Sequence, residues 1–161
     1  MELFTGTKLV KARTMNRGQY NTYRGWDIPK DENPNDEGYL VEYINTSKSN
    51  HPNHEGYVSW SPLDVFNEAY NNISTGIPFG SALELLEQGS KLARSGWNGK
   101  NMFVYHVPAA TYPTKTQVAK TEFGLHVDYG AYLAIKTVQG VVNTWVPSIS
   151  DILAKDWVVI K

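Results

Sequence analysis

The chain has 161 residues, which is the length of one domain or of two small ones. Hydrophobic residues make up 41% of the chain and charged residues 19%, so the composition predicts a buried core and excludes a disordered tail. The 15 Lys and Arg residues against 16 Asp and Glu give a formal charge of -1, which disfavours a general nucleic-acid-binding protein because such proteins need surplus cations. The absence of cysteine excludes disulfides, thiolate metal sites and a thiol nucleophile.

No leader peptide or membrane-spanning segment is predicted. Residues 1–7 have neither a basic start nor an apolar run, and no segment approaches the roughly 20 apolar residues that cross a bilayer. We therefore expect a cytoplasmic protein that does not contact membranes. The five Trp and ten Tyr residues are the unusual part of the composition, because such rings fill cores and also stack on planar ligands.

A polar stretch at residues 71–78, with turn-forming residues at both ends, divides the chain. Up to Ile73 there are 7 basic and 10 acidic residues, a net charge of -3; from Phe79 onward there are 8 and 6, a net charge of +2. Because the two parts differ in character, we predict two modules, residues 1–76 and 77–161.

The first module is predicted to pair short strands with short helices. The alternation of apolar and polar residues indicates strands over 8–13, 39–44 and 57–60, and the polar segment 16–26 indicates helical turns that end at Gly25. A helix is expected after Ser61, with Ser61 as its N-cap, Pro62 at its first position and Asp64 in its first turn. We expect this module to be a folded accessory.

The second module is predicted to start with a helix over 79–88, since its apolar residues recur at helical spacing and Gly89 follows. Strands are expected over 91–94, 102–107, 125–137, 141–146 and 157–160, with Asn98-Gly99 as a two-residue hairpin turn and a short helix capped by Ser148 and Asp151. Trp157 and Tyr132 are the expected core rings. The short connections exclude parallel crossovers, so the fold class is α+β: two small modules, each a short antiparallel sheet with one or two packed helices.

No catalytic or metal-binding set is predicted. Residues 94–100 resemble a phosphate loop but lack its first glycine and the Ser or Thr after the lysine. His51 and His54 flank a proline and have no third ligand nearby in the sequence. His106 and His126 have no nucleophile beside them. We therefore expect no enzyme activity, no cofactor and no metal.

Aromatic and polar residues alternate through the second module. The rings are Phe79, Trp97, Tyr105, Tyr129, Tyr132, Trp145 and Trp157, interleaved with Asn98, Asp128, Ser148 and Asp151. Several of these rings must form the core of so small a module. The others would sandwich a base while the polar groups bind sugar hydroxyls. Sequence spacing alone leaves both interpretations open.

The second module resembles a family of small phage proteins, the second Thoeris anti-defence family. The resemblance rests on the segments 79–83 (FGSAL), 93–103 (ARSGWNGKNMF), 145–148 (WVPS) and 151–157 (DILAKDW). It implies a viral protein without catalytic activity that sequesters cyclic nucleotide-like immune signals, glycocyclic ADP-ribose or a cyclic dinucleotide, in the cytoplasm of the infected bacterial host. It also implies a homotetramer with ligand pockets between subunits.

The ligand-binding positions that this resemblance implies are Phe79, Arg94, Trp97, Asn98, Asp128, Trp145, Ser148 and Asp151. This chain departs from the family pattern in carrying residues 1–76 before the matching part, and residues 127–130 match only loosely. The first module is similar to another small phage domain of unknown role. Two alternatives stay open: an enzyme acting on nucleotides, and a phage structural or host-takeover interaction protein with no small ligand.

Overall fold

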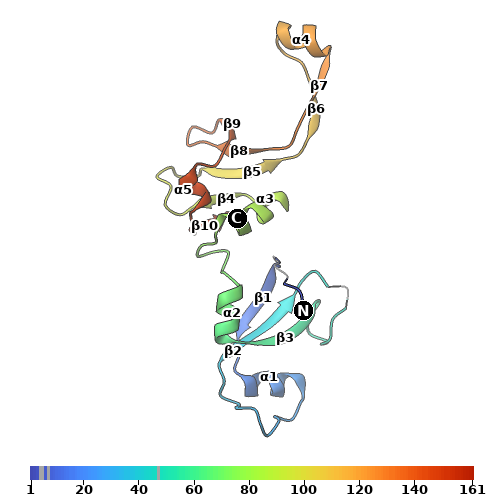
Figure 1. Ribbon diagram of the computed structural model, residues 1–161, viewed down its shortest axis with the longest axis vertical. Coiled ribbons are helices and arrows are strands. Elements are labelled where there is room, and N and C mark those ends of the chain that lie inside the picture. Colours follow the sequence, from blue (N-terminus) through green and yellow to red (C-terminus); the bar gives the residue numbers. More distant parts are fainter. Residues whose placement is uncertain (4–5, 7, 47) are drawn as a thin grey trace. The chain divides into compact units, whose positions relative to one another are not determined.

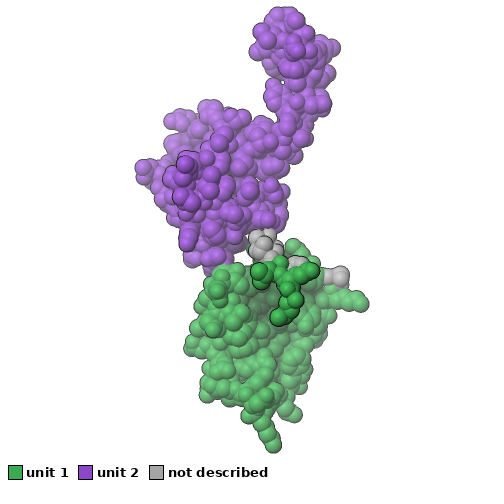
Figure 2. Space-filling view, viewed as in Figure 1, with its two compact units in different colours: residues 1–70 green, residues 71–161 purple. Residues whose placement is uncertain are grey.

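The computed structural model describes residues 1–3, 6, 8–46 and 48–161. These residues form two compact units, residues 1–70 and residues 71–161 (Figure 2). Residues 71–76, which the sequence placed in the first module, belong to the second unit: the Val159 amide donates to the Ile73 carbonyl, and Ile77 pairs with Trp157. Helices and antiparallel strands occur in both units, so the predicted α+β class is confirmed.

The first unit contains a three-stranded antiparallel sheet in the order β1-β2-β3 (Figure 1). The strands are β1 (Val10–Thr14), β2 (Gly38–Tyr43) and β3 (Tyr57–Pro62). Between β1 and β2 lies α1 (Arg17–Arg24), whose first turn is held by a capping box between Asn16 and Gln19 and which ends at Gly25. Gly25 has φ 70°, a left-handed conformation that glycine adopts without strain.

The core of the first unit is small. Tyr20 of α1 packs with Leu40 of β2 and Val58 of β3, and each of these side chains is at most 3% exposed. Ion pairing supports the loop that follows α1, since Arg17 binds Glu32 and Asn21 donates to the same carboxylate. This unit thus relies on polar ties as well as on apolar burial.

The helix expected after Ser61 begins one step later than its capping pattern predicts. β3 continues through Pro62, and α2 (Leu63–Ala69) starts with Pro62 as its N-cap and without a side-chain cap. The predicted Ser61 cap is therefore wrong, because strand pairing of Ser61 with Tyr39 holds its backbone extended inside the sheet. Aromatic contacts hold α2 to the sheet: the ring of Phe66 stacks on Tyr39 at 4.1 Å and on Tyr70 at 4.8 Å.

The second unit is built on a five-stranded antiparallel sheet in the order β10-β4-β5-β8-β9 (Figure 1). Its strands are β4 (Leu92–Arg94), β5 (Phe103–Val107), β8 (Tyr132–Lys136), β9 (Val142–Trp145) and β10 (Trp157–Val159). Strand β10 pairs with β4 and is the edge strand on that side of the sheet.

Helix α3 (Phe79–Glu87) supplies the main core contacts on one face of this sheet. Ala82, Leu85 and Leu86 of α3 pack with Leu92, Val104 and Trp157, and all of these are at most 8% exposed. A shorter helix, α5 (Ile149–Ile152), contacts α3 and begins with the predicted capping box of Ser148 and Asp151. Among the described residues, no helix has the length and apolar character needed to cross a membrane.

A hairpin arm extends from β5 and β8 and was not predicted. It consists of β6 (Ala110–Pro113), α4 (Gln117–Phe123) and β7 (His126–Tyr129), and Figure 1 shows α4 at its tip, away from the five-stranded sheet. The single strand expected over 125–137 is therefore wrong: it is two strands, of which β7 pairs with β6 and β8 with β5 and β9. Several apolar side chains of the arm are exposed, among them Val118 at 80% and Leu125 at 75%.

Two further local expectations are wrong. Asn98-Gly99 does not form a two-residue hairpin, because β4 and β5 are joined by a loop over residues 95–102. Tyr132 is not a core residue but 36% exposed, whereas Trp157 is fully buried as expected.

Candidate functional site

Four aromatic rings meet on the face of the five-stranded sheet that carries α3. They come from the start of α3 (Phe79), from the β4–β5 loop (Trp97), from β9 (Trp145) and from β10 (Trp157). Trp97 and Trp145 lie edge to face at 6.3 Å, and each contacts Trp157, at 5.5 and 5.8 Å. Phe79 completes this aromatic cluster at 5.6 Å from Trp157. Only Trp157 is fully buried; the other three rings are half-buried and keep part of their surface exposed.

The guanidinium group of Arg94 lies at the end of β4 and is held between two carboxylates. Its Nε donates to Asp156 at 2.9 Å, and its Nη1 donates to Asp151 at 3.0 Å and to the Ser150 carbonyl at 3.3 Å. Asp156 also accepts from the Gly96 amide at 3.0 Å, which fixes the start of the loop that carries Trp97. Arg94 therefore ties the β4–β5 loop to α5 and to the start of β10.

All three groups of this network are ionised at neutral pH. The hydrogen bond from Arg94 is the main reason why the pKa of Asp156 lies below its usual value. Burial has the largest single effect on Asp151 and raises its pKa, but hydrogen bonds from Ser148 and Arg94 together outweigh it and lower the pKa overall. The pKa of Arg94 is raised by its bonds to Asp156 and then Asp151. One cation between two anions leaves a local charge of minus one.

Ser148 and Asp151 also have a structural role, because they hold the first turn of α5. The Ser148 hydroxyl contacts the Asp151 carboxylate at 2.6 Å, and the Ser148 amide donates to the same carboxylate at 3.0 Å. The backbone oxygen of Asp151 in turn accepts from the Trp157 indole N–H at 3.0 Å. The cap, the cation and the aromatic cluster thus form one connected structure.

The structure brings most of the predicted site residues together and separates one of them. Phe79, Trp97 and Trp145 share the aromatic cluster, while Arg94 and Asp151 share the ion-pair network. Ser148 belongs to the α5 cap, and Asn98 follows Trp97 in the β4–β5 loop, where it is exposed.

Asp128 is the exception. It lies on β7 of the hairpin arm, opposite Thr111, whose hydroxyl donates to it at 2.6 Å. It is solvent-exposed there, and the arm extends away from the sheet that carries the aromatic cluster (Figure 1). Within one chain, Asp128 does not belong to the same site as the other predicted residues.

Comparison with known proteins identifies the second unit. Residues 77–160 match the model of a family described as Thoeris anti-defense 2-like domain. The chain belongs to this family. A curated relative, Thoeris anti-defense 2 of Bacillus phage SP01, is 38% identical over 89 residues, which cover 55% of this chain and all of that protein. The resemblance inferred from the sequence is therefore confirmed, and membership of this family supports an anti-defence role of phage origin.

Two residues of the site were missed or only partly understood from the sequence. Asp156 binds Arg94, Ser95 and Gly96 across about 60 positions of sequence, so no local pattern marks it as a partner. Trp157 was expected in the core and is buried there, but it is also the ring on which Phe79, Trp97 and Trp145 converge. The only available clue was that Asp156 and Trp157 end the last segment resembling the family.

The paired histidines of the first unit are engaged in protein contacts. His54 lies between the Tyr23 hydroxyl, 2.9 Å from its Nε2, and the Glu42 carboxylate, 3.1 Å from its Nδ1. His51 stacks on the Tyr23 ring at 4.4 Å. Across residues 1–3, 6, 8–46 and 48–161, no group of three or more His, Asp or Glu side chains has the arrangement of a metal site.

Proposed function

We propose that this protein is a phage anti-defence protein whose second unit binds and sequesters a cyclic nucleotide-derived immune signal without degrading it. Glycocyclic ADP-ribose is the first candidate ligand, and cyclic dinucleotides are the second. The observation that carries the proposal is the aromatic cluster, in which Phe79, Trp97 and Trp145 remain half-buried beside fixed carboxylates. The family to which the chain belongs supports the same role.

Each part of the site suits one part of such a ligand. Half-buried indole rings stack on a base, an interaction worth about 1–3 kcal/mol per base. The Asp151 carboxylate, which is held in a fixed position, can accept hydrogen bonds from ribose hydroxyls, and the side-chain amide of Asn98 can accept or donate them. Arg94 is already neutralised by Asp151 and Asp156, so in this proposal it orients those carboxylates and is not the main phosphate ligand.

The electrostatics of the site favour binding over catalysis. A general acid or base works best when its pKa lies near the working pH. The pKa values of both carboxyl groups are instead lowered: that of Asp156 mainly by its hydrogen bond from Arg94, and that of Asp151 because hydrogen bonds from Ser148 and Arg94 outweigh the effect of burial. Carboxylates of this kind are weak bases and hold no proton to donate at neutral pH.

The proposal includes self-assembly, with a homotetramer as the expected form. Asp128 stands apart from the aromatic cluster of its own chain, and the arm that carries it exposes Phe123 at 58% and Tyr129 at 53%. Placing the arm of one copy against the cluster of another would bring Asp128 into the pocket and cover these apolar side chains. Light scattering should then report an oligomer, and a monomer that binds ligand tightly would contradict this part of the proposal.

The decisive experiment distinguishes sequestration from degradation. The protein is mixed with glycocyclic ADP-ribose or a cyclic dinucleotide, free ligand is removed, and the complex is heated to denature the protein. Recovery of the intact ligand in an amount that matches the protein is the expected result. Recovery of an altered nucleotide would show an enzyme, and the absence of any bound ligand would favour the alternative function.

That alternative is a phage structural or host-takeover protein that binds a macromolecule. It is favoured by one feature of the first unit: Trp26 is 52% exposed and Ile28 40% exposed beside an acidic loop. Exposed aromatic and aliphatic side chains of this kind are common where proteins meet. Within the main proposal, the first unit is a folded accessory to the ligand-binding unit.

A further inference from the structure

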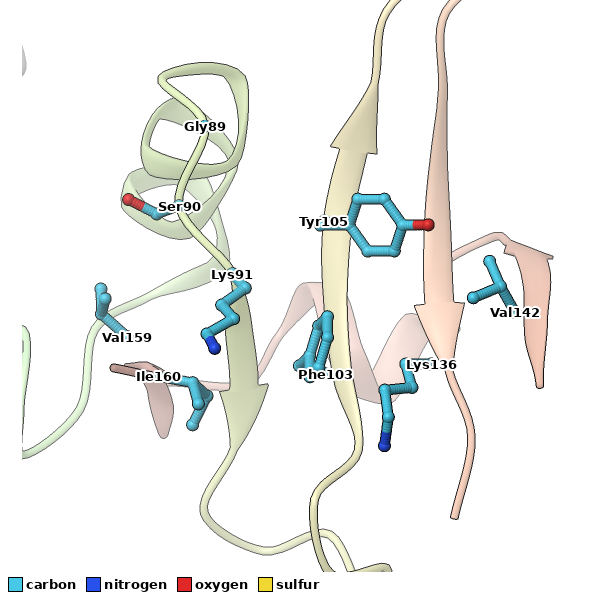
Figure 3. Close-up of a pocket in the computed structure, with 9 residues that line it drawn as sticks. All are labelled: Gly89, Ser90, Lys91, Phe103, Tyr105, Lys136, Val142, Val159 and Ile160. Atoms are coloured by element: carbon cyan, nitrogen blue, oxygen red, sulfur yellow. The ribbon is translucent and has the colours of Figure 1, made fainter. Parts of the chain in front are cut away.

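The five-stranded sheet has a second face, and its side chains line an open groove (Figure 3). Strand pairing places Phe103 opposite Lys136 and Tyr105 opposite Ala134, so these side chains point away from the face that carries Val104 and Ile135. The groove has a volume of about 560 Å3, which is within the usual range for small-molecule sites. Its walls come from residues 89–91, which lie between α3 and β4, from residues 159–160 at the end of β10, and from β5, β8 and β9.

Two lysine side chains converge on one ring in this groove. The Nζ atom of Lys91 lies 5.4 Å from the centre of the Phe103 ring and that of Lys136 lies 5.8 Å from it, both within the range of a cation–π contact. Figure 3 shows Phe103 between the two lysines, with Tyr105 beyond it on the same strand. Both lysine residues are half-buried.

These two ammonium groups lack the partners that neutralise Arg94. In the part of the chain that the structure describes, neither lysine forms an ion pair with a carboxylate. Lys136 donates to the Asn101 carbonyl at 3.1 Å, which positions its Nζ and leaves further N–H donors free. Each ammonium group is therefore able to bind an anion at the groove, on its own side of the Phe103 ring.

From this arrangement we propose that the groove formed by Lys91, Phe103, Tyr105 and Lys136 is a separate binding site for a ligand that carries both a phosphate group and a flat ring. Lys91 or Lys136 binds the phosphate through a charge-assisted hydrogen bond, and the half-buried ring of Tyr105 contacts the flat part. Val142 and Ile160 line the groove as apolar walls. This site lies on the opposite face of the sheet from the aromatic cluster, so it goes beyond the site of the proposed function.

The experiment uses adenosine monophosphate as the probe and the full chain, with binding measured by calorimetry at low and moderate salt. Adenosine, which lacks the phosphate, tests the contribution of charge. The variants are Lys91→Gln and Lys136→Gln, alone and together, and the matched control is Lys120→Gln, an exposed lysine on α4 of the arm. Circular dichroism and the melting temperature confirm that each variant is folded.

We expect adenosine monophosphate to bind at least tenfold more tightly than adenosine. Its affinity should fall as salt is added. The double lysine variant should reduce its affinity at least tenfold, whereas Lys120→Gln should leave it within twofold. Trp97→Ala should also leave it within twofold, while the same variant reports separately on glycocyclic ADP-ribose. The proposal for the groove and the proposal for the aromatic cluster are then tested independently of each other.

Three outcomes would overturn the inference. The first is no binding of adenosine monophosphate at millimolar concentration by the folded protein. The second is binding that Trp97→Ala abolishes and the lysine variants leave intact, which would place the probe in the aromatic cluster. The third is a change of oligomer mass in the lysine variants without any probe binding, which would make the groove a contact between copies of the chain.

Discussion

The cations on the two faces of the five-stranded sheet differ in whether they are paired with carboxylates. On the face that carries α3, the cation Arg94 is held by Asp151 and Asp156, and the rings beside it pack into a connected cluster. On the other face, Lys91 and Lys136 stand over Phe103 without carboxylate partners among the described residues. Strand alternation alone separates the two sets, since Leu92 follows Lys91 and Val104 follows Phe103.

The difference shows that the arginine of a sequence motif is not automatically an anion site. Arg94 belongs to the segment that resembles the family, yet its hydrogen bonds to Asp156, Asp151 and Ser150 are directed at its own protein. Two lysines outside that motif keep free donors. A ligand with bases, sugars and phosphates would therefore meet different chemistry on each face.

The largest expected effect concerns the burial of Trp157. Replacing it by alanine should lower the free energy of unfolding by about 3–5 kcal/mol, because the ring is fully buried among Leu86, Leu92 and Val104. Urea titration followed by circular dichroism measures this change. The matched control is Trp26→Ala in the first unit, where the ring is 52% exposed and the loss should be below about 1 kcal/mol. Equal losses in the two variants would contradict the assignment of Trp157 as the centre of the core.

Trp97 should separate ligand binding from stability. Because its ring is half-buried and lies at the edge of the cluster, Trp97→Ala should weaken binding of glycocyclic ADP-ribose by at least about tenfold, the loss of one stacked base. Its melting temperature should fall less than that of Trp157→Ala. Calorimetry on the folded variant measures the affinity, and an unchanged value would place the ligand elsewhere.

Asp156 should make the second unit sensitive to acid. Its pKa is lowered in the folded protein, so its contribution to stability is complete above the unfolded value of about 3.9 and is lost as the pH falls through the lower folded pKa. Asp156→Asn should therefore cost about 1 kcal/mol at pH 7, less than the roughly 1.5–3 kcal/mol typical of hydrogen bonds to charged groups, because the side chain is partly exposed.

The difference in the free energy of unfolding between Asp156→Asn and the parent protein should shrink below about pH 4, where the parent loses the same interaction. Unfolding titrations of both proteins at pH 7, at pH 5, at pH 4 and below pH 4 measure this difference. Asp31→Asn, in the exposed acidic loop of the first unit, is the control and should have little effect at any of these values. A difference between parent and variant that stays constant with pH would show that Asp156 acts by packing alone.

The smallest effect on ligand affinity is expected from removal of the first unit. Deletion of residues 1–70 should leave glycocyclic ADP-ribose binding within about twofold, because the aromatic cluster and the Arg94 network come entirely from residues 71–161. The deletion should begin at residue 71 and not at 77, since the Ile73 carbonyl binds β10. Calorimetry tests the affinity and light scattering the assembly. Loss of binding in a folded deletion variant would show that the first unit supplies part of the pocket.

Local sequence determined most of the secondary structure, because its signals act over a few residues. The capping box at Ser148 and Asp151, the left-handed Gly25 and the helical spacing that begins at Phe79 each specify one element through contacts within three or four positions. The same reasoning failed at Ser61, where sheet pairing prevailed over a helix cap, and along residues 125–137, where the chain divides between two sheets.

The site itself depended on tertiary structure. The sequence identified the aromatic and polar residue types of the second unit, but which rings are core and which are accessible follows from packing around Trp157. The pairing of Arg94 with Asp156 spans 62 positions, and Asp128 is separated from its expected neighbours by the course of the arm. Local alternation assigns side chains to opposite faces of a strand, but contacts between distant parts of a chain depend on strand order, which no local pattern encodes.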